Sequence, residues 1–191
     1  PWLCGPLVVI AVTAVINFVN FTDGLDGIVA GCMAISLGAM AINGASGLWP
    51  LVGALAGFLI WNWAPARVFM GDVGSTFLGA VFAGMVLQAS SWPQALALLL
   101  LATPLLADAC LCVLRRAVDG QRIFQAHRLH LFQRLHQAGW SHQKVAGLYA
   151  GATAVLAVLQ LLLGLSGVLI GAIAVLSAGL WLDKKEAVPF A

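Results

Sequence analysis

Residues 3–27 read LCGPLVVIAVTAVINFVNFTDGLDG, an apolar run that ends in two amides, two carboxylates and two glycines. Helical geometry puts the two amides on one face of the last turn, and the two acids follow in a glycine-bearing turn. The polar residues recur every three positions: Asn17, Asn20, Asp23 and Asp26. An apolar run closed by a short polar break recurs along the whole chain, and this repetition predicts the fold.

The composition is that of an integral membrane protein. Of the 191 residues 62% are hydrophobic and 8% are charged, with a mean hydropathy of +1.00, whereas soluble domains carry about 25% charged residues. A helix needs roughly 20 apolar residues to cross the bilayer core. The net charge of +2 arises from nine basic and seven acidic residues, and this balance argues against a nucleic-acid partner.

Seven apolar segments follow from the hydropathy pattern. Pro50 and Pro93 fall in the first turn of the third and fifth segments, and Pro104 should kink the fifth. We therefore expect an all-α fold, a polytopic transmembrane bundle of about seven spanning helices in a single domain, residues 1–191. The segments are 3–21, 27–43, 48–64, 73–90, 93–114, 145–164 and 167–182.

The charges predict which face of the membrane each break occupies. Seven crossings put residues 22–26, 65–72, 115–144 and the tail after 182 on one side, and every Lys and Arg lies there. Basic residues mark cytoplasmic loops. We therefore expect the chemistry to lie at the cytoplasmic surface, at the depth of the lipid head groups.

A second polar motif, RVFMGDVGSTFLG, occupies residues 67–79 at the start of the fourth segment. Gly71 and Gly74 let backbone approach a ligand, Ser75 adds a hydroxyl, and a new helix offers free N–H groups. Asp72 is a candidate Mg²⁺ ligand, because Mg²⁺ is commonly held by one or two carboxylates together with substrate phosphate. The alternative is that Asp72 simply caps the helix while Ser75 faces solvent.

The third motif, HRLHLFQRLHQAGWSH, occupies residues 127–142 in the one long loop. Helical spacing puts His127, His130 and Arg134 on one face, which predicts an amphipathic helix against the membrane or a neighbouring helix. Its polar face can hold an anionic group, or it can simply contact acidic lipid. The two histidines can also form a metal pair, but no third ligand lies at a convincing spacing. The four cysteines lie in apolar runs and are interpreted as buried residues, not as ligands.

Two further polar residues lie at segment ends. Asn62, between two tryptophans, is interpreted as a satisfied amide in an aromatic belt. Asp108 is a functional-site candidate, because a carboxylate within a spanning helix is costly. Carboxylates for Mg²⁺ and cationic groups for phosphate are what phosphoryl transfer needs, so the residues predict Mg²⁺-dependent chemistry on a phosphorylated substrate beside lipid.

The motifs NFVNFTDGLDG, FMGDVGSTFLG and HRLHLFQRL, in this order, resemble those of the polyprenyl-phosphate N-acetylhexosamine-1-phosphate transferases, membrane glycosyltransferase family 4. The resemblance covers most of residues 15–145. It implies transfer of a sugar-1-phosphate from a UDP-N-acetylhexosamine to undecaprenyl phosphate at the cytoplasmic face of the bacterial inner membrane. This reaction starts a cell-envelope polysaccharide, releases UMP and uses Mg²⁺.

The resemblance also implies roles for individual residues. Asp72 would bind the metal, and the first motif would line the nucleotide and catalytic centre with Asn17, Asn20, Asp23 and Asp26. The loop residues His127, Arg128 and His130 would contribute to the nucleotide-sugar site. The HRxH pattern followed by QRL looks more like the O-antigen and exopolysaccharide initiators than the peptidoglycan enzymes. A homodimer is an open alternative.

One departure from the family pattern bears on activity. The family has an Asp-Asp pair on an earlier helix, and no such pair occurs here. We therefore expect an N-terminally truncated transferase that is inactive alone. The alternatives are a transporter or lipid-binding protein for an anionic solute, an inactive fragment, or a CDP-alcohol phosphotransferase, whose motif is not met after Asp23.

Overall fold

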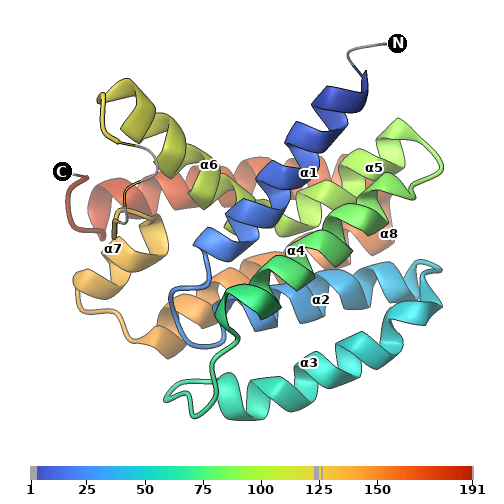
Figure 1. Ribbon diagram of the computed structural model, residues 1–191, viewed down its shortest axis with the longest axis horizontal. Helices are drawn as coiled ribbons and strands as arrows, with labels where there is room; N and C mark the ends of the chain where they lie inside the picture. Colours follow the sequence, from blue (N-terminus) through green and yellow to red (C-terminus); the bar gives the residue numbers. More distant parts are fainter. Residues whose placement is uncertain (1–3, 123–124, 126, 191) are drawn as a thin grey trace.

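The computed structural model describes residues 4–122, 125 and 127–190. This described part of the chain is built from helices and contains no strand (Figure 1). The elements are α1 (Cys4–Phe21), α2 (Ile28–Ile42), η1 (Ser46–Leu48), α3 (Trp49–Asn62), α4 (Gly71–Leu87), α5 (Trp92–Leu99), η2 (Leu100–Ala102), α6 (Thr103–Val118), α7 (Leu131–Gln137) and α8 (His142–Lys185).

The predicted apolar segments reappear as helices, with two interruptions that the sequence explains. The fifth segment is divided by η2, and Pro104 lies in the first turn of α6, so the predicted kink is confirmed. The last two segments form α8, whose one non-helical residue is Gly164, with φ 61° and ψ −143°. After this break the chain reverses direction, which places Gly171 against Leu156 and Leu159.

The central element is α2, which is apolar all round and buries 11 of its 15 residues. A helix without a polar face finds its place inside a bundle, not at its edge. It packs against α3 on one side and α8 on another, while α1 lies along α4. Ile28, Met33, Leu37 and Met40 are among the large side chains that α2 contributes to the core.

The outer helices expose apolar side chains in a way that suits lipid. Two stretches, Trp92–Val118 and His142–Lys185, are long and apolar enough to span a membrane, and the other apolar helices are shorter. Only 22% of the most apolar window of α8 is buried within the protein, and Leu162 and Ile170 are largely exposed. Apolar surface of this extent needs a partner other than water, although the number of crossings stays a prediction.

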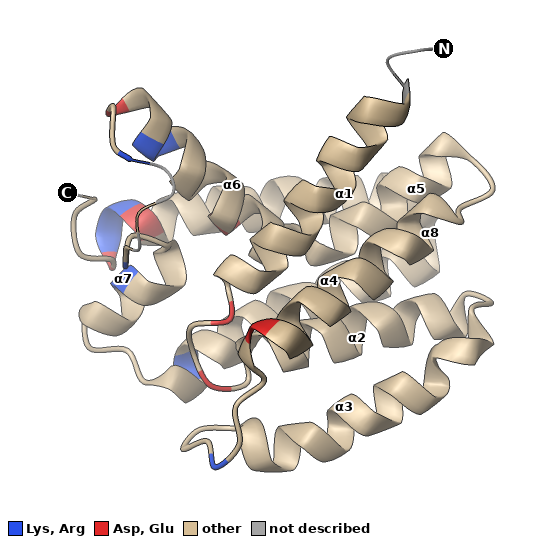
Figure 2. Ribbon diagram, viewed as in Figure 1, with Lys and Arg blue, Asp and Glu red and all other residues tan. Residues whose placement is uncertain are grey.

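The charged residues gather at one end of the bundle, where the loops after α1, α3 and α6 lie (Figure 2). The loops at the opposite end, residues 43–45 and 88–91, carry no charge. This arrangement has the sidedness that the charge pattern predicts.

The long polar loop contains less helix than expected. We predicted one amphipathic helix that carries His127, His130 and Arg134 on a single face, but α7 begins at Leu131. His130 is extended, with φ −60° and ψ 149°, and precedes the first turn. The physical reason is local, because Asp108 of α6 accepts hydrogen bonds from the first two amides of α7 and fixes the helix start there. The chain leaves α7 through Gly139, which has a φ of 97°, and Ser141 caps the next helix by accepting a hydrogen bond from the amide of Lys144.

Candidate functional site

A pocket of about 210 Å³ opens at the charged end of the bundle. The turn after α1 and the start of α4 form its walls, so the first two sequence motifs meet in space as predicted. The acids Asp23, Asp26 and Asp72 all line this pocket. Its other lining residues are Gly24, Leu25, Asn62, Phe69, Met70 and Gly71.

Asp23 and Asp72 are a pair of acids without partners. No described residue donates a hydrogen bond or an ion pair to either carboxylate. Burial, together with the negative charge of Asp72, raises the pKa of Asp23 to about 6 from an ordinary value of 3.8. Two neighbouring carboxylates that lack protein donors form an oxygen-rich site that fits a hard divalent cation such as Mg²⁺.

Asp26 differs from these two acids because it is already bonded within the protein. Its Oδ2 accepts a hydrogen bond of 3.1 Å from the amide of Ala66 and lies 3.1 Å from Nδ1 of His142. Gln143 reinforces the same junction with a 2.6 Å bond to the carbonyl of Ala64. Asp26 therefore joins the turn after α1 to the loop after α3 and to the start of α8.

The side chain of Asn62 links the turn after α1 to the loop after α3. Its Oδ1 accepts a 3.1 Å bond from the amide of Gly27, and its Nδ2 donates a 2.9 Å bond to the carbonyl of Val68. The interpretation of Asn62 as a satisfied amide is confirmed, but this residue also lines the acidic pocket. The signal that could have indicated this is a buried amide at the end of an apolar helix, next to two charged loops.

The predicted substrate-binding amides lie outside the pocket lining. Ser75 donates a 2.6 Å bond to Oδ1 of Asn20, which ties α4 to α1, and Asn17 donates a 2.7 Å bond to the carbonyl of Thr13 in its own helix. Ser75 is fully buried. The alternative in which Ser75 faces solvent is therefore wrong. Contacts of these residues with substrate stay a prediction.

Gly71 and Asp72 open α4 in a conformation that keeps the backbone accessible. Gly71 has a φ of 65° and no atom within 4 Å of where a side chain would begin. Met70 is the N-cap residue, without a side-chain cap bond, and Asp72 lies exposed in the first turn. Asp72 is thus not the cap of α4, and its carboxylate is available at the positive end of the helix dipole.

The third motif packs against the first. A side chain at Gly24 would begin 2.9 Å from the ring of Phe132, so α7 lies directly on the acidic turn. Asp108 positions α7, because its two oxygens accept bonds from the amides of Leu131 (2.7 Å) and Phe132 (3.1 Å), and Oδ2 also accepts a 2.6 Å bond from the hydroxyl of Tyr149. Asp108 is therefore a positioning residue for α7, and the prediction that it belongs to a functional site stays a prediction.

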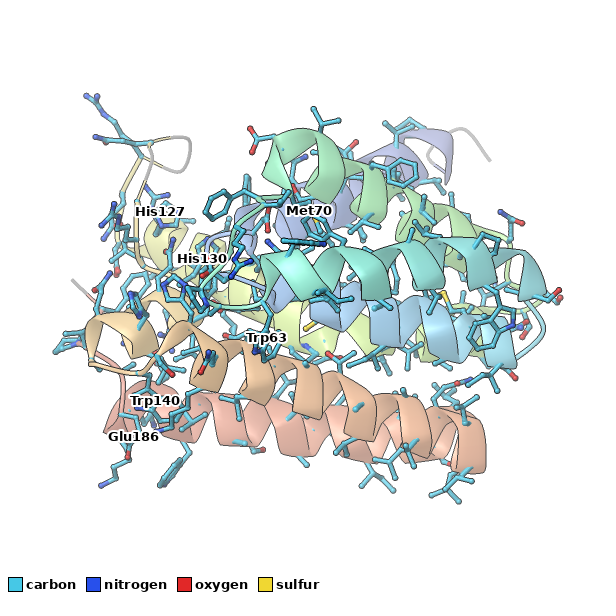
Figure 3. All side chains as sticks on the ribbon, turned by 90° about the horizontal axis from the view of Figure 1, so that it is seen from below. Trp63, Met70, His127, His130, Trp140 and Glu186 are labelled. Atoms are coloured by element: carbon cyan, nitrogen blue, oxygen red, sulfur yellow. The ribbon has the colours of Figure 1, made fainter. Side chains whose placement is uncertain are left out.

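His127 and His130 lie next to one another at the charged end of the bundle (Figure 3). Burial, His130 and Arg116 lower the pKa of His127 to about 4. Burial alone would also lower the pKa of His130. The hydrogen bonding and charge of Asp108 and Cys112 outweigh it and raise that pKa to about 9.

The two predicted arginines take different positions. Arg134 is buried, pairs with Asp183 near the end of α8, and donates a 2.7 Å bond from Nε to the carbonyl of Val188. Its guanidinium is thus engaged within the protein, away from the acidic pocket. Arg128 is exposed, and its carbonyl accepts a bond from Gln137. The roles of both arginines at a substrate stay predictions.

The first 90 residues, which hold the whole acidic pocket, match a known family model, that of Glycosyl transferase family 4. This match covers just under half of the chain. That match, residues 1–90, covers the first motif at the end of α1 and the second at the start of α4. Asp23 and Asp72 therefore lie inside these matched residues, here called the family region.

Curated relatives extend the similarity beyond residue 90. A phospho-N-acetylmuramoyl-pentapeptide-transferase of Synechococcus sp. (strain JA-3-3Ab) is 34% identical over 169 residues, covering 81% of this chain and 48% of the relative. A probable undecaprenyl-phosphate N-acetylglucosaminyl 1-phosphate transferase of Bacillus subtilis (strain 168) is 32% identical over 155 residues, covering 74% and 43%. The chain thus spans about half the length of the curated relatives it matches.

Both of these relatives are named as transferases. Their names fall on both sides of the branch that the sequence motifs address, one a pentapeptide transferase and one an N-acetylglucosaminyl 1-phosphate transferase. Other relatives of 35–36% identity also carry the pentapeptide-transferase name, so the comparisons do not support the predicted closer relation to the O-antigen and exopolysaccharide initiators.

Proposed function

We propose that this protein transfers an N-acetylhexosamine-1-phosphate from a UDP-sugar to undecaprenyl phosphate at the cytoplasmic face of the bacterial inner membrane. An oxygen of the lipid phosphate attacks the sugar-bearing phosphorus, a new P–O bond forms, and the bond to the bridging oxygen breaks to release UMP. The observation that carries the proposal is the pair of partnerless acids, Asp23 and Asp72, in a pocket inside the family region.

The acids fit a magnesium ion. Asp72 is the proposed ligand, and Asp23 is the neighbouring carboxylate, whose pKa is raised by burial and by the negative charge of Asp72. A bound Mg²⁺ would neutralise the charge of the diphosphate and of the leaving nucleotide. The chain itself supplies the accessible backbone of Gly71 and the first amides of α4, which favour an anion at this position.

The proposal gives the remaining predicted residues roles around this centre. Asp26 joins the turn after α1 to the loop after α3 and to the start of α8, and in the proposal its remaining oxygen faces the nucleotide side of the pocket. His127, His130 and Arg128 lie on the loop beside α7, which contacts the acidic turn through Phe132, and the proposal assigns them to the nucleotide sugar.

The lipid substrate would approach from the apolar sides of the bundle. A cavity of about 130 Å³ lies between α6, α7 and α8, and most of its lining is aliphatic, including Leu111, Leu148 and Leu176. Together with the exposed apolar faces of α8, this surface suits membrane lipid and a polyprenyl chain. These features support a multi-pass membrane location.

Asp72→Asn is the decisive variant, tested in membranes that contain the protein expressed from its complete gene. We expect formation of lipid-linked sugar to fall by about 100-fold or more, because a metal ion contributes several kcal/mol to the transition state. Asp119→Asn is the matched control, since Asp119 is an exposed acid outside the pocket, and it should keep full activity. Undiminished product with Asp72→Asn would overturn the proposal.

The same assay tests which UDP-sugar donor the protein uses, and therefore to which branch of the transferases it belongs. Membranes supplied with UDP-N-acetylglucosamine or with a UDP-linked N-acetylmuramoyl-pentapeptide would give different lipid-linked products. The HRxH pattern at His127 and His130 favours the first donor, as in the initiators of O-antigen and exopolysaccharide. Product from the pentapeptide donor alone would assign the chain to peptidoglycan synthesis.

A further inference from the structure

Cys112, His127 and His130 form a second cluster of potential ligands, separate from the acidic pocket. One sulfur and two imidazole nitrogens lie within 4.8 Å of one another, although the residues come from α6 and from the loop before α7. Sequence spacing did not reveal a third ligand for the histidine pair, because Cys112 precedes them by a long stretch of chain. Folding supplies it from a neighbouring helix.

The donor set differs in kind from that of the acidic pocket. A thiolate and two imidazoles are soft or borderline ligands, which select zinc-like transition metals, whereas carboxylate oxygens suit Mg²⁺. The structure therefore offers two sites of different chemistry at the same end of the bundle.

The surroundings of His130 are those of a metal-binding imidazole. Its Nδ1 lies 3.5 Å from Oδ1 of Asp108, which leaves Nε2 as the ring nitrogen for a ligand. Metal-ligating histidines almost always present their other nitrogen to a carboxylate or carbonyl in this way. Nδ1 is buried and makes no well-formed hydrogen bond with any described residue. A metal on Nε2 would place positive charge on the ring and favour a hydrogen bond from Nδ1 to Asp108, which would satisfy this poorly bonded nitrogen.

The other two ligands complete the geometry of an accessible site. Cys112 is buried at 3% exposure, whereas His127 is partly exposed and gives solvent access. Nδ1 of His127 accepts only a 3.3 Å bond from the amide of Leu129.

From this arrangement we propose that Cys112, His127 and His130 bind a zinc-type divalent transition metal, with a fourth position open to water or an exogenous ligand. Three protein ligands with one open position are typical of zinc sites that exchange a bound molecule. The bound metal would fasten the loop at residues 127–130 to α6, beside the capping of α7 by Asp108. The proposed function also assigns His127 and His130 to the nucleotide sugar, but the metal proposal is tested by metal binding and does not depend on the transferase activity.

Cobalt(II) is a suitable probe, because its absorption reports thiolate ligation. The protein is purified in detergent without a polyhistidine tag, treated with EDTA, freed of chelator and titrated with Co²⁺. We expect one equivalent to bind with a thiolate-to-cobalt charge-transfer band, and Zn²⁺ to displace it. Thermal unfolding in the same detergent should shift to higher temperature when Zn²⁺ is added.

Variants identify the ligands. Cys112→Ser should abolish the charge-transfer band, and His127→Gln or His130→Gln should weaken Co²⁺ binding and remove the thermal shift. Cys110→Ser and His136→Gln are the matched controls, because each removes a similar side chain outside the cluster, and both should bind as the wild type does. The proposal is overturned if the wild type shows no charge-transfer band, or if Cys112→Ser retains it.

Discussion

At the scale of single residues, Gly24 shows how closely the acidic turn and α7 approach each other. The space beside its Cα is filled by the ring of Phe132, with the amide of Gln133 next to it. Phe132 is completely buried, stacks on the ring of His130 and meets the ring of Tyr149 edge-on. The ring therefore has little freedom to move aside.

Gly24→Ala should destabilise the protein and disturb the pocket together. The new methyl carbon would lie 2.9 Å from Cε2 of Phe132, and overpacking of this kind costs about 1–3 kcal/mol. Thermal or denaturant unfolding in detergent measures the loss. Gly147→Ala is the control, because Gly147 is an exposed helical glycine without neighbours within 4 Å, and its substitution should be neutral or slightly stabilising. Equal stability of the two variants would contradict the contact.

Residues whose role depends on contacts distant in the sequence were the least predictable. The acids of the first two motifs were identified as a site because their glycines and helix ends are local features. Asn62 was identified only as a satisfied amide, and His142 was not singled out, since its bond to Asp26 depends on the packing of α8. The pairing of Cys112 with the two histidines is of the same kind.

At the scale of elements, α7 depends on a single carboxylate from another helix. Asp108 is 7% exposed and accepts three hydrogen bonds, two of them from the first turn of α7. A seven-residue helix is too short to be stable by itself. Its position on the acidic turn therefore follows from this cap and from the burial of Phe132 and Leu135.

Asp108→Ala should release α7 from α6. It leaves two amides and a buried hydroxyl without an acceptor, so we expect a loss of about 3 kcal/mol or more. Hydrogen exchange of the amides of Leu131 and Phe132 should accelerate strongly. Tyr149→Phe removes only the hydroxyl and should cost about 1 kcal/mol with normal exchange in α7. Unchanged exchange in the Asp108→Ala variant would show that α7 is held by its apolar contacts alone.

The reversal within α8 depends on one residue as well. Gly164 adopts φ 61° and ψ −143°, a region that is essentially restricted to glycine. No atom lies within 4 Å of a side chain built there, so any cost of a substitution comes from the backbone.

Gly164→Ala should therefore destabilise the α8 hairpin by about 1–3 kcal/mol. Gly151→Ala is a matched control in the same helix, because that glycine is helical and equally free of neighbours; it should be neutral or stabilising. Unfolding curves of the two variants provide the comparison. A neutral Gly164→Ala would mean that the chain reverses without this backbone conformation.

At the scale of the whole molecule, the charge distribution predicts a fixed orientation in the membrane. Cysteines introduced at Ser90 and at Asp119 should react with a membrane-impermeant maleimide from opposite sides, with Asp119 on the cytoplasmic side. The background changes Cys4 and Cys110 to serine, since Cys32 and Cys112 are buried. Labelling of both positions from one side would contradict the proposed topology.

The architecture was more predictable than the details of the loops. Long apolar segments and their proline positions determined the helices to within a few residues, because burial and chain stiffness act locally along each segment. The predicted start of the helix in the long loop was wrong. Residues 127–130 have helical spacing in the sequence, but Asp108 of α6 caps α7 at Leu131 and Phe132, so the helix begins only there. The break in α8 is a single glycine rather than the short loop expected at residues 165–166.

The residues that line the acidic pocket and the residues that hold it in place are synthesised at different times. Every residue that lines the acidic pocket lies between Asp23 and Asp72, so its walls can assemble once α4 has left the ribosome. The contacts of Phe132 with Gly24, and of His142 with Asp26, come from chain that is made later. Chains fold progressively from the N-terminus during translation. The nascent protein therefore passes through a stage in which the acids of the pocket lie close together but the contacts from α7 and α8 have not yet formed. Synthesis of α7 and of the start of α8 ends that stage.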